Sequence, residues 1–277
     1  MIFIIGCQGR LGQALSSSYP EAGVTCIDRA TYQNWWQEES KNHISDFFAP
    51  YADSGSIIFV TSGILDPKSS HEEHMRVNYL LPKHIIDSAT KAGLRVVTFG
   101  TVMESLIKKQ NSYIETKTML GNYVANLTTP NSLALHVRIH TLYGSGQPSP
   151  FMFLGQIHHA LVEGTIFEMT SGKQLREYHH IEDEVKAIRM LVDKKVNGVL
   201  DLSHGEPVSL KDIASYVFSS FNCEKNLRIG ALPEPAEENY GIVFQRPDIL
   251  GSATFRESLP AIRSYIQECL QEAREPA

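Results

Sequence analysis

The N-terminal dozen residues restrict the fold more than any other part of the chain. A short apolar run, Met1–Ile5, comes first, and three glycines follow at three-residue spacing: Gly6, Gly9 and Gly12. The residues after Gly9 have helical character. A strand that turns through glycines into a helix presents free backbone N–H groups and the positive end of the helix dipole, which suits a pyrophosphate. The pattern predicts a dinucleotide-binding turn, and a glycine turn used only for packing is the alternative.

Short apolar runs recur along the chain and alternate with helical segments. The clearest runs are Val24–Ile27, Ser56–Thr61, Arg95–Gly100 and Ser132–Ile139. Glu72–Ala92 is helical in pattern, whereas Thr31–Gly55 is polar and aromatic without a strand pattern. This alternation predicts an α/β fold, a Rossmann-type doubly wound parallel sheet with helices on both faces.

Charge and hydropathy exclude several classes of partner. The chain has 25 Lys and Arg against 31 Asp and Glu, a net charge of −6, which disfavours nucleic acid. No apolar stretch reaches the roughly 18 residues that a membrane-spanning helix needs, and no basic leader precedes the N-terminal apolar run. We therefore expect a cytoplasmic protein that binds neither nucleic acid nor a membrane.

Cysteines and histidines show no pattern of a disulfide framework or a metal site. The four cysteines are far apart and form neither a C-x-x-C pair nor a zinc-type spacing with histidine: Cys7, Cys26, Cys223 and Cys269. The pairs His158-His159 and His179-His180 consist of neighbours, whose side chains point in different directions on a helix or strand. We predict no disulfide framework and no metal, and we interpret the histidines as surface or substrate-pocket residues.

Asp28 ends the second apolar run, sixteen residues after Gly12. A carboxylate at this place accepts hydrogen bonds from the adenosine ribose hydroxyls and repels a 2′-phosphate, which favours NAD over NADP. Arg10 and Arg29 weaken this preference because a guanidinium can pair with a 2′-phosphate. The lean to NAD is therefore slight, and a cap on a turn at the strand end is the alternative role for Asp28.

Tyr113 and Lys117 are one turn apart on the same face of a predicted helix. A nearby ammonium favours phenolate and so lowers the pKa of the phenol. A phenol tuned in this way can exchange a proton with an alcohol or a carbonyl. The spacing alone is frequent by chance, but here it follows a strand that ends in Thr101, whose hydroxyl can bind the same reacting oxygen.

Together these features resemble the extended short-chain dehydrogenase/reductases, specifically the NAD(P)-dependent nucleotide-sugar epimerase, dehydratase and reductase group. Further segments match the group in the same order: Val77-Asn78, Arg138-Ile-His-Thr-Leu-Tyr143-Gly144, Arg176-Glu-Tyr-His-His-Ile-Glu-Asp183 and Gly198-Val-Leu-Asp-Leu-Ser-His-Gly205-Glu206-Pro-Val-Ser209. The resemblance implies an NAD(P)-dependent oxidoreductase that forms a homodimer. We expect residues 1–144 to form mainly the dinucleotide-binding Rossmann domain, and residues 145–277 to add the remaining Rossmann elements and a smaller C-terminal substrate-binding part.

The resemblance also implies a role for each matching residue. Tyr113 is the general acid/base, Lys117 binds the nicotinamide ribose and tunes the phenol, and Thr101 lies beside the substrate oxygen. The implied cofactor-binding set is Gly6, Gly9, Arg10, Leu11, Gly12, Asp28, Arg29, Thr61, Ser62, Gly63, Tyr113 and Lys117. Arg176 and Arg246 fall where the family grips the diphosphate of a nucleotide-sugar substrate, and surface ion pairs are the alternative role for both.

Two departures from the family pattern narrow the expected function. Dehydratases of the group carry Asp-Glu directly after the hydroxyl residue, because elimination of water needs an extra acid and base. This chain has Val102 and Met103 there, and the bifunctional epimerase-reductases have Cys where Met103 stands. Glu104 is one step away and leaves the dehydratase argument open. We expect reduction of a keto group on a nucleotide-linked deoxysugar; an NAD-dependent nucleotide-sugar 4-epimerase and a non-catalytic NAD(P)-binding sensor or scaffold are the alternatives.

Overall fold

The computed structural model describes residues 1–66, 68–107, 111–127 and 132–273. By its internal contacts the chain forms two compact units. Unit 1 comprises Met1–Ile139 and Val185–Leu202, and unit 2 comprises His140–Glu184 and Ser203–Ala277. Each unit has a hydrophobic core of its own.

Within the described ranges, unit 1 contains a six-stranded sheet in the order β10-β5-β4-β3-β1-β2. The strands are β1 (Ile2–Ile5), β2 (Val24–Ile27), β3 (Ile57–Val60), β4 (Arg95–Thr101), β5 (Ala134–Ile139) and β10 (Gly198–Asp201). Every neighbouring pair is parallel. Strands buried on both faces need continuous apolar sequence, and Phe3, Ile4 and Ile5 are accordingly buried. The predicted doubly wound parallel sheet is confirmed.

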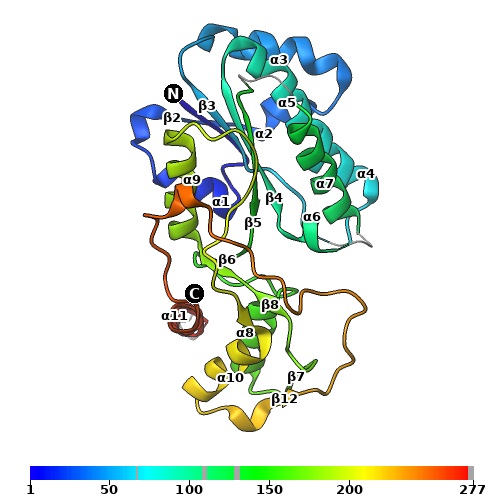
Figure 1. The fold of residues 1–277 in the computed structure, drawn as a ribbon, viewed down its shortest axis with the longest axis vertical. Coiled ribbons are helices and arrows are strands. Elements are labelled where there is room, and N and C mark those ends of the chain that lie inside the picture. Colours follow the sequence, from blue (N-terminus) through cyan, green and yellow to red (C-terminus); the bar gives the residue numbers. More distant parts are fainter. Residues whose placement is uncertain (67, 108–110, 128–131, 274–277) are drawn as a thin grey trace. The chain divides into compact units, whose positions relative to one another are not determined.

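Helices cover both faces of this sheet (Figure 1). Helices α1 (Arg10–Ser17) and α9 (Ile181–Asp193) lie on one face, and α3 (Lys41–Phe48), α5 (Leu81–Ala89) and α7 (Ser112–Ala125) lie on the other. Shorter helices are α2 (Arg29–Tyr32), α4 (His71–His74), the π-helix η4 (Met75–Leu80) and α6 (Met103–Leu106). The segment without a strand pattern forms α2 and α3. Phe48 of α3 packs there against Phe3 in the core, and Trp35 packs against Phe48.

In its described residues, unit 2 has strands that pair in twos. They are β11 (Val208–Ser209) with β8 (Leu175–Arg176), β12 (Leu227–Ile229) with β7 (Phe167–Met169), and β6 (Thr141–Tyr143) with β9 (Tyr178–His180). Its helices are α8 (Phe153–Glu163), α10 (Leu210–Ser220) and α11 (Ser258–Glu272). Ser209 caps α10 by accepting the N–H of Asp212 at 3.0 Å. Helices α8, α10 and α11 bury their apolar faces in one core, which includes Ile157, Val217 and Ile266.

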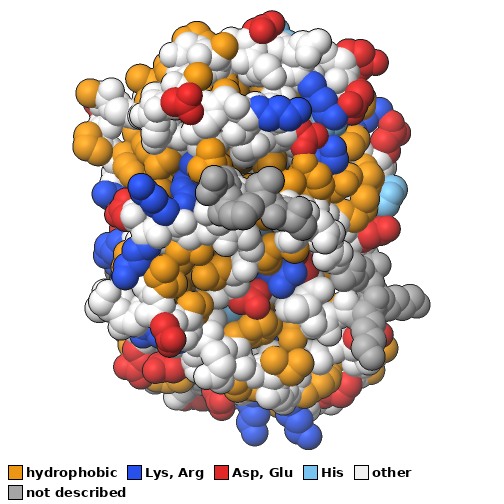
Figure 2. All heavy atoms as spheres, turned by 45° about the horizontal axis from the view of Figure 1, so that its top comes forward, with side chains coloured by type: hydrophobic (Ala, Val, Ile, Leu, Met, Phe, Trp, Pro, Cys, Tyr) orange, Lys and Arg blue, Asp and Glu red, His pale blue; other side chains and the backbone are white. Residues whose placement is uncertain are grey.

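Single 3₁₀ turns connect several of these elements: η1 (Glu21–Gly23), η2 (Glu38–Ser40), η3 (Ala49–Tyr51), η5 (Thr90–Ala92), η6 (Glu224–Asn226) and η7 (Asp248–Leu250). No helix in the described ranges is both long and apolar enough to cross a bilayer. On the face drawn in Figure 2, basic and acidic side chains both occur, with hydrophobic side chains between them. Such a mixture is usual for a surface in contact with water.

Cys7 and Cys26 form a disulfide, which corrects the prediction that the four cysteines form none. The two residues are 19 positions apart in sequence, but their Cα atoms are only 5.8 Å apart. The parallel pairing of β1 with β2 places Ile5 opposite Ile27. The residues that follow β1 therefore lie beside the end of β2, a proximity that sequence spacing alone does not reveal.

Candidate functional site

A cavity of about 640 Å³ lies in unit 1 at the carboxyl ends of β1, β2 and β3. Its wall contains the Gly6–Gly9 turn after β1, Asp28 and Arg29 after β2, and Thr61–Ile64 after β3. In the sheet, β2 lies on one side of β1 and β3 lies on the other. The chain therefore leaves β1 in one direction and crosses back past it to form β3. In open α/β sheets, such a reversal creates the crevice in which ligands bind.

The turn after β1 has no room for a side chain at Gly6 or at Gly12. Gly6 has φ of +93°, and a Cβ there would lie 2.5 Å from the backbone nitrogen of Ser62. A Cβ on Gly12 would collide with the carbonyl oxygen of Gly6. Thr61 Oγ1 ties the two segments together by donating to the carbonyl oxygen of Ile5 at 2.9 Å. The bare backbone at the start of α1 therefore fits the pyrophosphate of a dinucleotide.

The cavity brings together most of the predicted cofactor residues outside α7: Gly6, Gly9, Asp28, Arg29, Thr61, Ser62 and Gly63. Arg10, Leu11 and Gly12 lie at the start of α1, outside the cavity wall. The Asp28 carboxylate accepts the N–H of Ala30 at 3.4 Å and caps α2. Asp28 therefore combines the alternative role of a turn cap with a position in the cavity wall.

The wall also contains residues that no motif indicates. Tyr32 and Trp36 come from the aromatic stretch after β2, and Arg76 comes from η4. The Arg76 guanidinium carbon lies 4.5 Å from the centroid of the Trp36 ring. A nitrogen of the same guanidinium pairs with Glu72. One end of the cavity thus has aromatic and cationic walls. The unusual aromatic content of this stretch was the only available signal in the sequence.

Asn78, from the Val77-Asn78 match, holds the loop after β3. It is buried in η4; its Oδ1 accepts the N–H of Ile64 at 2.8 Å, and its Nδ2 donates to the carbonyl oxygen of Ile64 at 2.9 Å. A Cβ on the adjacent Gly63 would lie 3.4 Å from Asn78 Oδ1 and 3.5 Å from Lys117 Nζ. The Lys117 ammonium therefore lies directly beside a residue of the cavity wall.

Lys117 and Tyr113 lie on α7, and Thr101 ends β4. Lys117 Nζ donates to the carbonyl oxygen of Phe99 at 2.8 Å, and burial lowers its pKa to about 8. Burial, followed by the Glu104 carboxylate, raises the pKa of Tyr113 above its ordinary value. This direction differs from the expected lowering of the phenol pKa by Lys117, because the penalty for a buried phenolate dominates.

Glu104 is buried with its side chain 0% exposed. Its Oε2 accepts Arg138 Nε at 3.0 Å, and its Oε1 accepts the backbone N–H of Thr101 at 2.7 Å and lies 3.4 Å from His136 Nε2. A Cβ on Gly100 would collide with this carboxylate. Burial alone would raise the pKa of Glu104, but these partners hold it below its ordinary value. The contacts of the Glu104 carboxylate therefore hold the end of β4 in place.

Arg176 and Arg246 both lie in unit 2 and are partly buried. Arg176 Nη2 pairs with Glu238. Arg246 donates from Nε to the carbonyl oxygen of Leu250 at 3.0 Å and from Nη2 to that of Ala253. These contacts hold the irregular segment before α11. The predicted role of both arginines at a diphosphate remains a prediction.

Agreement with a family model decides the classification. Residues 2–202 match the NAD dependent epimerase/dehydratase family. The chain belongs to this family. The resemblance to the extended short-chain dehydrogenase/reductases is thereby confirmed, and so is the prediction of an NAD(P)-dependent enzyme of this type. No curated protein sequence matches the chain.

Solved structures of other proteins share the fold of this epimerase/dehydratase family member. MoeE5 in complex with UDP-glucose and NAD is 18% identical, with a TM-score of 0.75 over 99% of each chain. A dTDP-4-dehydrorhamnose reductase from Clostridium acetobutylicum is 18% identical, with a TM-score of 0.75 over 96% of this chain and 98% of that one. A UDP-glucose 4-epimerase from Thermotoga maritima, with UDP-glucose, is 13% identical, with a TM-score of 0.78 over 99% of each chain.

Proposed function

We propose that this enzyme reduces a keto group on a nucleotide-linked deoxysugar. The observation that carries the proposal is the environment of β4's end. Val102 is buried and apolar, Met103 is apolar, and Glu104 is committed to Arg138 and Thr101. Among the described residues that follow Thr101 directly, none offers the additional acid and base that dehydration across two sugar carbons needs. Reduction of one carbonyl needs a single proton donor, which Tyr113 supplies.

In this proposal each site residue has a defined task. Tyr113 donates its phenolic proton to the carbonyl oxygen of the sugar, and the Thr101 hydroxyl donates a hydrogen bond to the same oxygen. Lys117 binds the nicotinamide ribose. The bound NAD(P)H supplies the hydride. Because the pKa of Tyr113 is raised, the phenol is protonated at neutral pH, as a proton donor must be.

Unit 1 binds the cofactor in this proposal. The backbone of the glycine turn, with Arg10 and Leu11 at the start of α1, holds the pyrophosphate, and Asp28 accepts the adenosine ribose hydroxyls. Thr61, Ser62 and Gly63 line the cavity beside Lys117. NAD is the proposed cofactor, and Arg29 is the cavity residue that would favour NADP instead.

Unit 2 binds the nucleotide-sugar substrate in this proposal, with Arg176 and Arg246 directed at its diphosphate. Two of the similar structures contain UDP-glucose, and a third is a reductase of a nucleotide-linked keto-deoxysugar. These likenesses support a nucleotide sugar as the substrate class. A homodimer is a further proposal that rests on the resemblance, and a cytoplasmic location is one that rests on the hydropathy of the sequence.

A nucleotide-sugar 4-epimerase is the second candidate, favoured by the likeness to the Thermotoga maritima epimerase. Such an enzyme uses the same residues but retains its cofactor, because it oxidises and then re-reduces the same carbon. A non-catalytic NAD(P)-binding sensor or scaffold is the third. Such a protein would bind cofactor without turning over any nucleotide sugar.

Cofactor stoichiometry tests the proposed function. We expect the purified protein to contain little bound NAD, and we expect activity to require added reduced cofactor, consumed one for one with a keto sugar. Spectrophotometric assays of cofactor consumption and chromatography of the nucleotide sugars measure both quantities. If stoichiometric NAD survives purification and two nucleotide sugars interconvert without net cofactor consumption, the enzyme is the epimerase.

Asp28→Ala tests the choice of cofactor. Loss of charge-assisted hydrogen bonds to the ribose costs about 1.5 to 3 kcal/mol, or at least about tenfold in NAD affinity. NADP affinity should fall less, because the same change removes a charge that repels the 2′-phosphate. Dissociation constants for both cofactors measure the effect, with Asp46→Ala on the exposed side of α3 as the control. A strong preference for NADP in the unmodified protein would contradict the role given to Asp28.

A further inference from the structure

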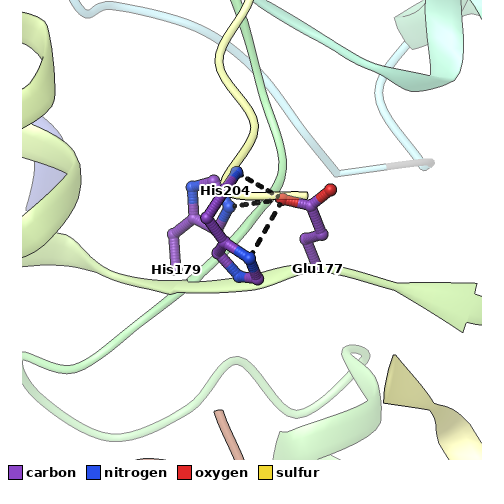
Figure 3. Close-up of side chains that lie close together, drawn as sticks. All are labelled: Glu177, His179 and His204. Carbon is purple, nitrogen blue, oxygen red and sulfur yellow. Dashed lines mark hydrogen bonds and ion pairs between the residues drawn. The ribbon is translucent and has the colours of Figure 1, made fainter. Parts of the chain in front are cut away.

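Unit 2 contains a buried cluster of one carboxylate and three imidazoles that the proposed reduction does not use. The side chains of Glu177, His179, His204 and His140 are 1%, 0%, 6% and 5% exposed. Figure 3 shows Glu177, His179 and His204 directed toward one another. Their potential ligand atoms all lie within 4.8 Å of one another. Burial of a carboxylate and imidazoles costs solvation free energy unless other groups or an ion compensate for it.

The backbone explains how distant segments bring these side chains together. Glu177 and His179 are two positions apart in extended chain, so their side chains point to the same side. Strand β6 pairs in parallel with β9, which brings His140, directly before β6, next to Glu177. The backbone N–H of His204 donates to Glu177 Oε2 at 2.8 Å, and the Ser203 hydroxyl donates to Oε1 at 2.7 Å. Three separate segments of unit 2 therefore converge on one carboxylate.

The spacing of the ligand atoms suits a four-coordinate ion. Glu177 Oε2 lies 3.1 Å from His179 Nε2 and 3.6 Å from His204 Nδ1. Glu177 Oε1 lies 3.7 Å from His140 Nε2. Ligands about 2.0 to 2.2 Å from a tetrahedral Zn²⁺ are separated by about 3.3 to 3.6 Å. The separations of Glu177 Oε2 from the His179 and His204 nitrogens, 3.1 and 3.6 Å, are close to this range.

A second carboxylate orients His179. Glu184 Oε2 accepts from His179 Nδ1 at 2.6 Å, and an ion at Nε2 would replace the proton that this nitrogen shares with Glu177. In the described part of the chain, the buried Nε2 atoms of His140 and His204 have no hydrogen-bond partner. His204 Nδ1 accepts the N–H of Glu206 at 3.1 Å, so this contact must be released before Nδ1 can bind an ion.

We propose that Glu177, His179 and His204 bind one divalent transition-metal ion, with His140 beside the cluster. Imidazole and carboxylate ligands in four-coordinate geometry match Zn²⁺, whereas Mg²⁺ and Ca²⁺ prefer oxygen ligands alone. Because the three ligands are buried, the ion is structural. It cross-links two segments of unit 2 and takes no part in the reduction. The prediction of no metal considered cysteine spacings and histidines adjacent in sequence, whereas these ligands converge from separate segments.

Metal binding to the full-length protein tests this proposal. The protein is stripped with a chelator and titrated with Zn²⁺ by isothermal calorimetry, and elemental analysis counts the bound ions. We expect one Zn²⁺ per chain and a rise in melting temperature with Zn²⁺ but not with Mg²⁺. Co²⁺ in place of Zn²⁺ should give the intense visible absorption of a four-coordinate site. Failure of the unmodified protein to bind Zn²⁺ stoichiometrically would overturn the proposal and would show that the cluster holds only protons.

Variants then locate the site. Glu184→Gln should weaken Zn²⁺ binding about 10- to 100-fold by loss of orientation, and His204→Gln should abolish stoichiometric binding. His159→Gln, on the exposed side of α8, is the matched control and should bind like the unmodified protein. Equal loss in His159→Gln and His204→Gln would assign binding to surface histidines and overturn the proposal. If His204→Gln does not fold, the Co²⁺ spectrum of the unmodified protein decides, because a six-coordinate spectrum contradicts the site.

Discussion

Replacing Tyr113 by phenylalanine should lower turnover about a hundredfold or more while cofactor affinity barely changes. The substitution removes the proton that the proposed reduction transfers but leaves the ring that packs 6.4 Å from His74, measured between ring centroids. Steady-state rates with a keto nucleotide sugar and dissociation constants for NAD(H) measure the two effects separately. Lys117→Met should instead lower both turnover and cofactor affinity, because the Lys117 ammonium lies beside the cavity wall at Gly63.

Tyr123→Phe provides the matched control on the same helix. The Tyr123 hydroxyl donates to Asp87, so its loss should affect stability but leave turnover of the folded protein near normal. Full activity in Tyr113→Phe would remove this phenol from the mechanism. Tight cofactor binding without turnover in the unmodified protein would instead favour the sensor or scaffold.

Replacing Glu104 by glutamine should destabilise the protein by about 3 to 5 kcal/mol, the usual cost of removing one partner from a buried ion pair. The change removes the carboxylate 3.0 Å from Arg138, which keeps Asp201 at 3.5 Å, and disturbs the contact with His136. Denaturant unfolding measures the free energy of unfolding. Glu115→Gln is the control, because this carboxylate is on the neighbouring helix α7 and 51% exposed; a loss as large in the control would contradict the assignment.

The unmodified protein and Glu104→Gln should also differ in how acid changes their free energy of unfolding. Because the pKa of Glu104 is lower in the folded protein than its ordinary value, the ionised group stabilises the fold above the unfolded pKa of about 4.3. This contribution is lost as pH falls through the folded pKa. The stability gap between the unmodified protein and Glu104→Gln should therefore shrink below about pH 4. A gap that stays constant down to the acid transition would show that the Glu104 charge adds nothing.

Features that depend on short stretches of chain could be predicted from the sequence. Gly6 is required by its φ of +93° and Gly12 by its close contact with the Gly6 carbonyl oxygen, and Asp28 and Thr61 are in the cavity because each closely follows the end of a parallel strand. Parallel strands end at the same edge of a sheet, so strand ends identified one by one are sufficient to assemble this wall.

Features that depend on contacts between distant segments could not be predicted. The commitment of Glu104 depends on the space that Gly100 and Gly121 leave for its carboxylate. Tyr32 and Trp36 reach the cavity only through the path of the chain after β2. Helix α11 (Ser258–Glu272) had no predicted counterpart; its buried face is defined by α8 and α10, which are far away in sequence.

The order of synthesis matters for a sheet whose strand β10 is made last. Strand β5 ends at Ile139, but its neighbour β10 begins only at Gly198, after the first segment of unit 2. Until then, the growing chain carries β5 as an open edge whose residues Ala134, Leu135 and Val137 are fully buried in the finished protein. Open apolar edges invite pairing with other chains. During the interval between synthesis of β5 and β10, the nascent chain is therefore exposed to aggregation through this edge.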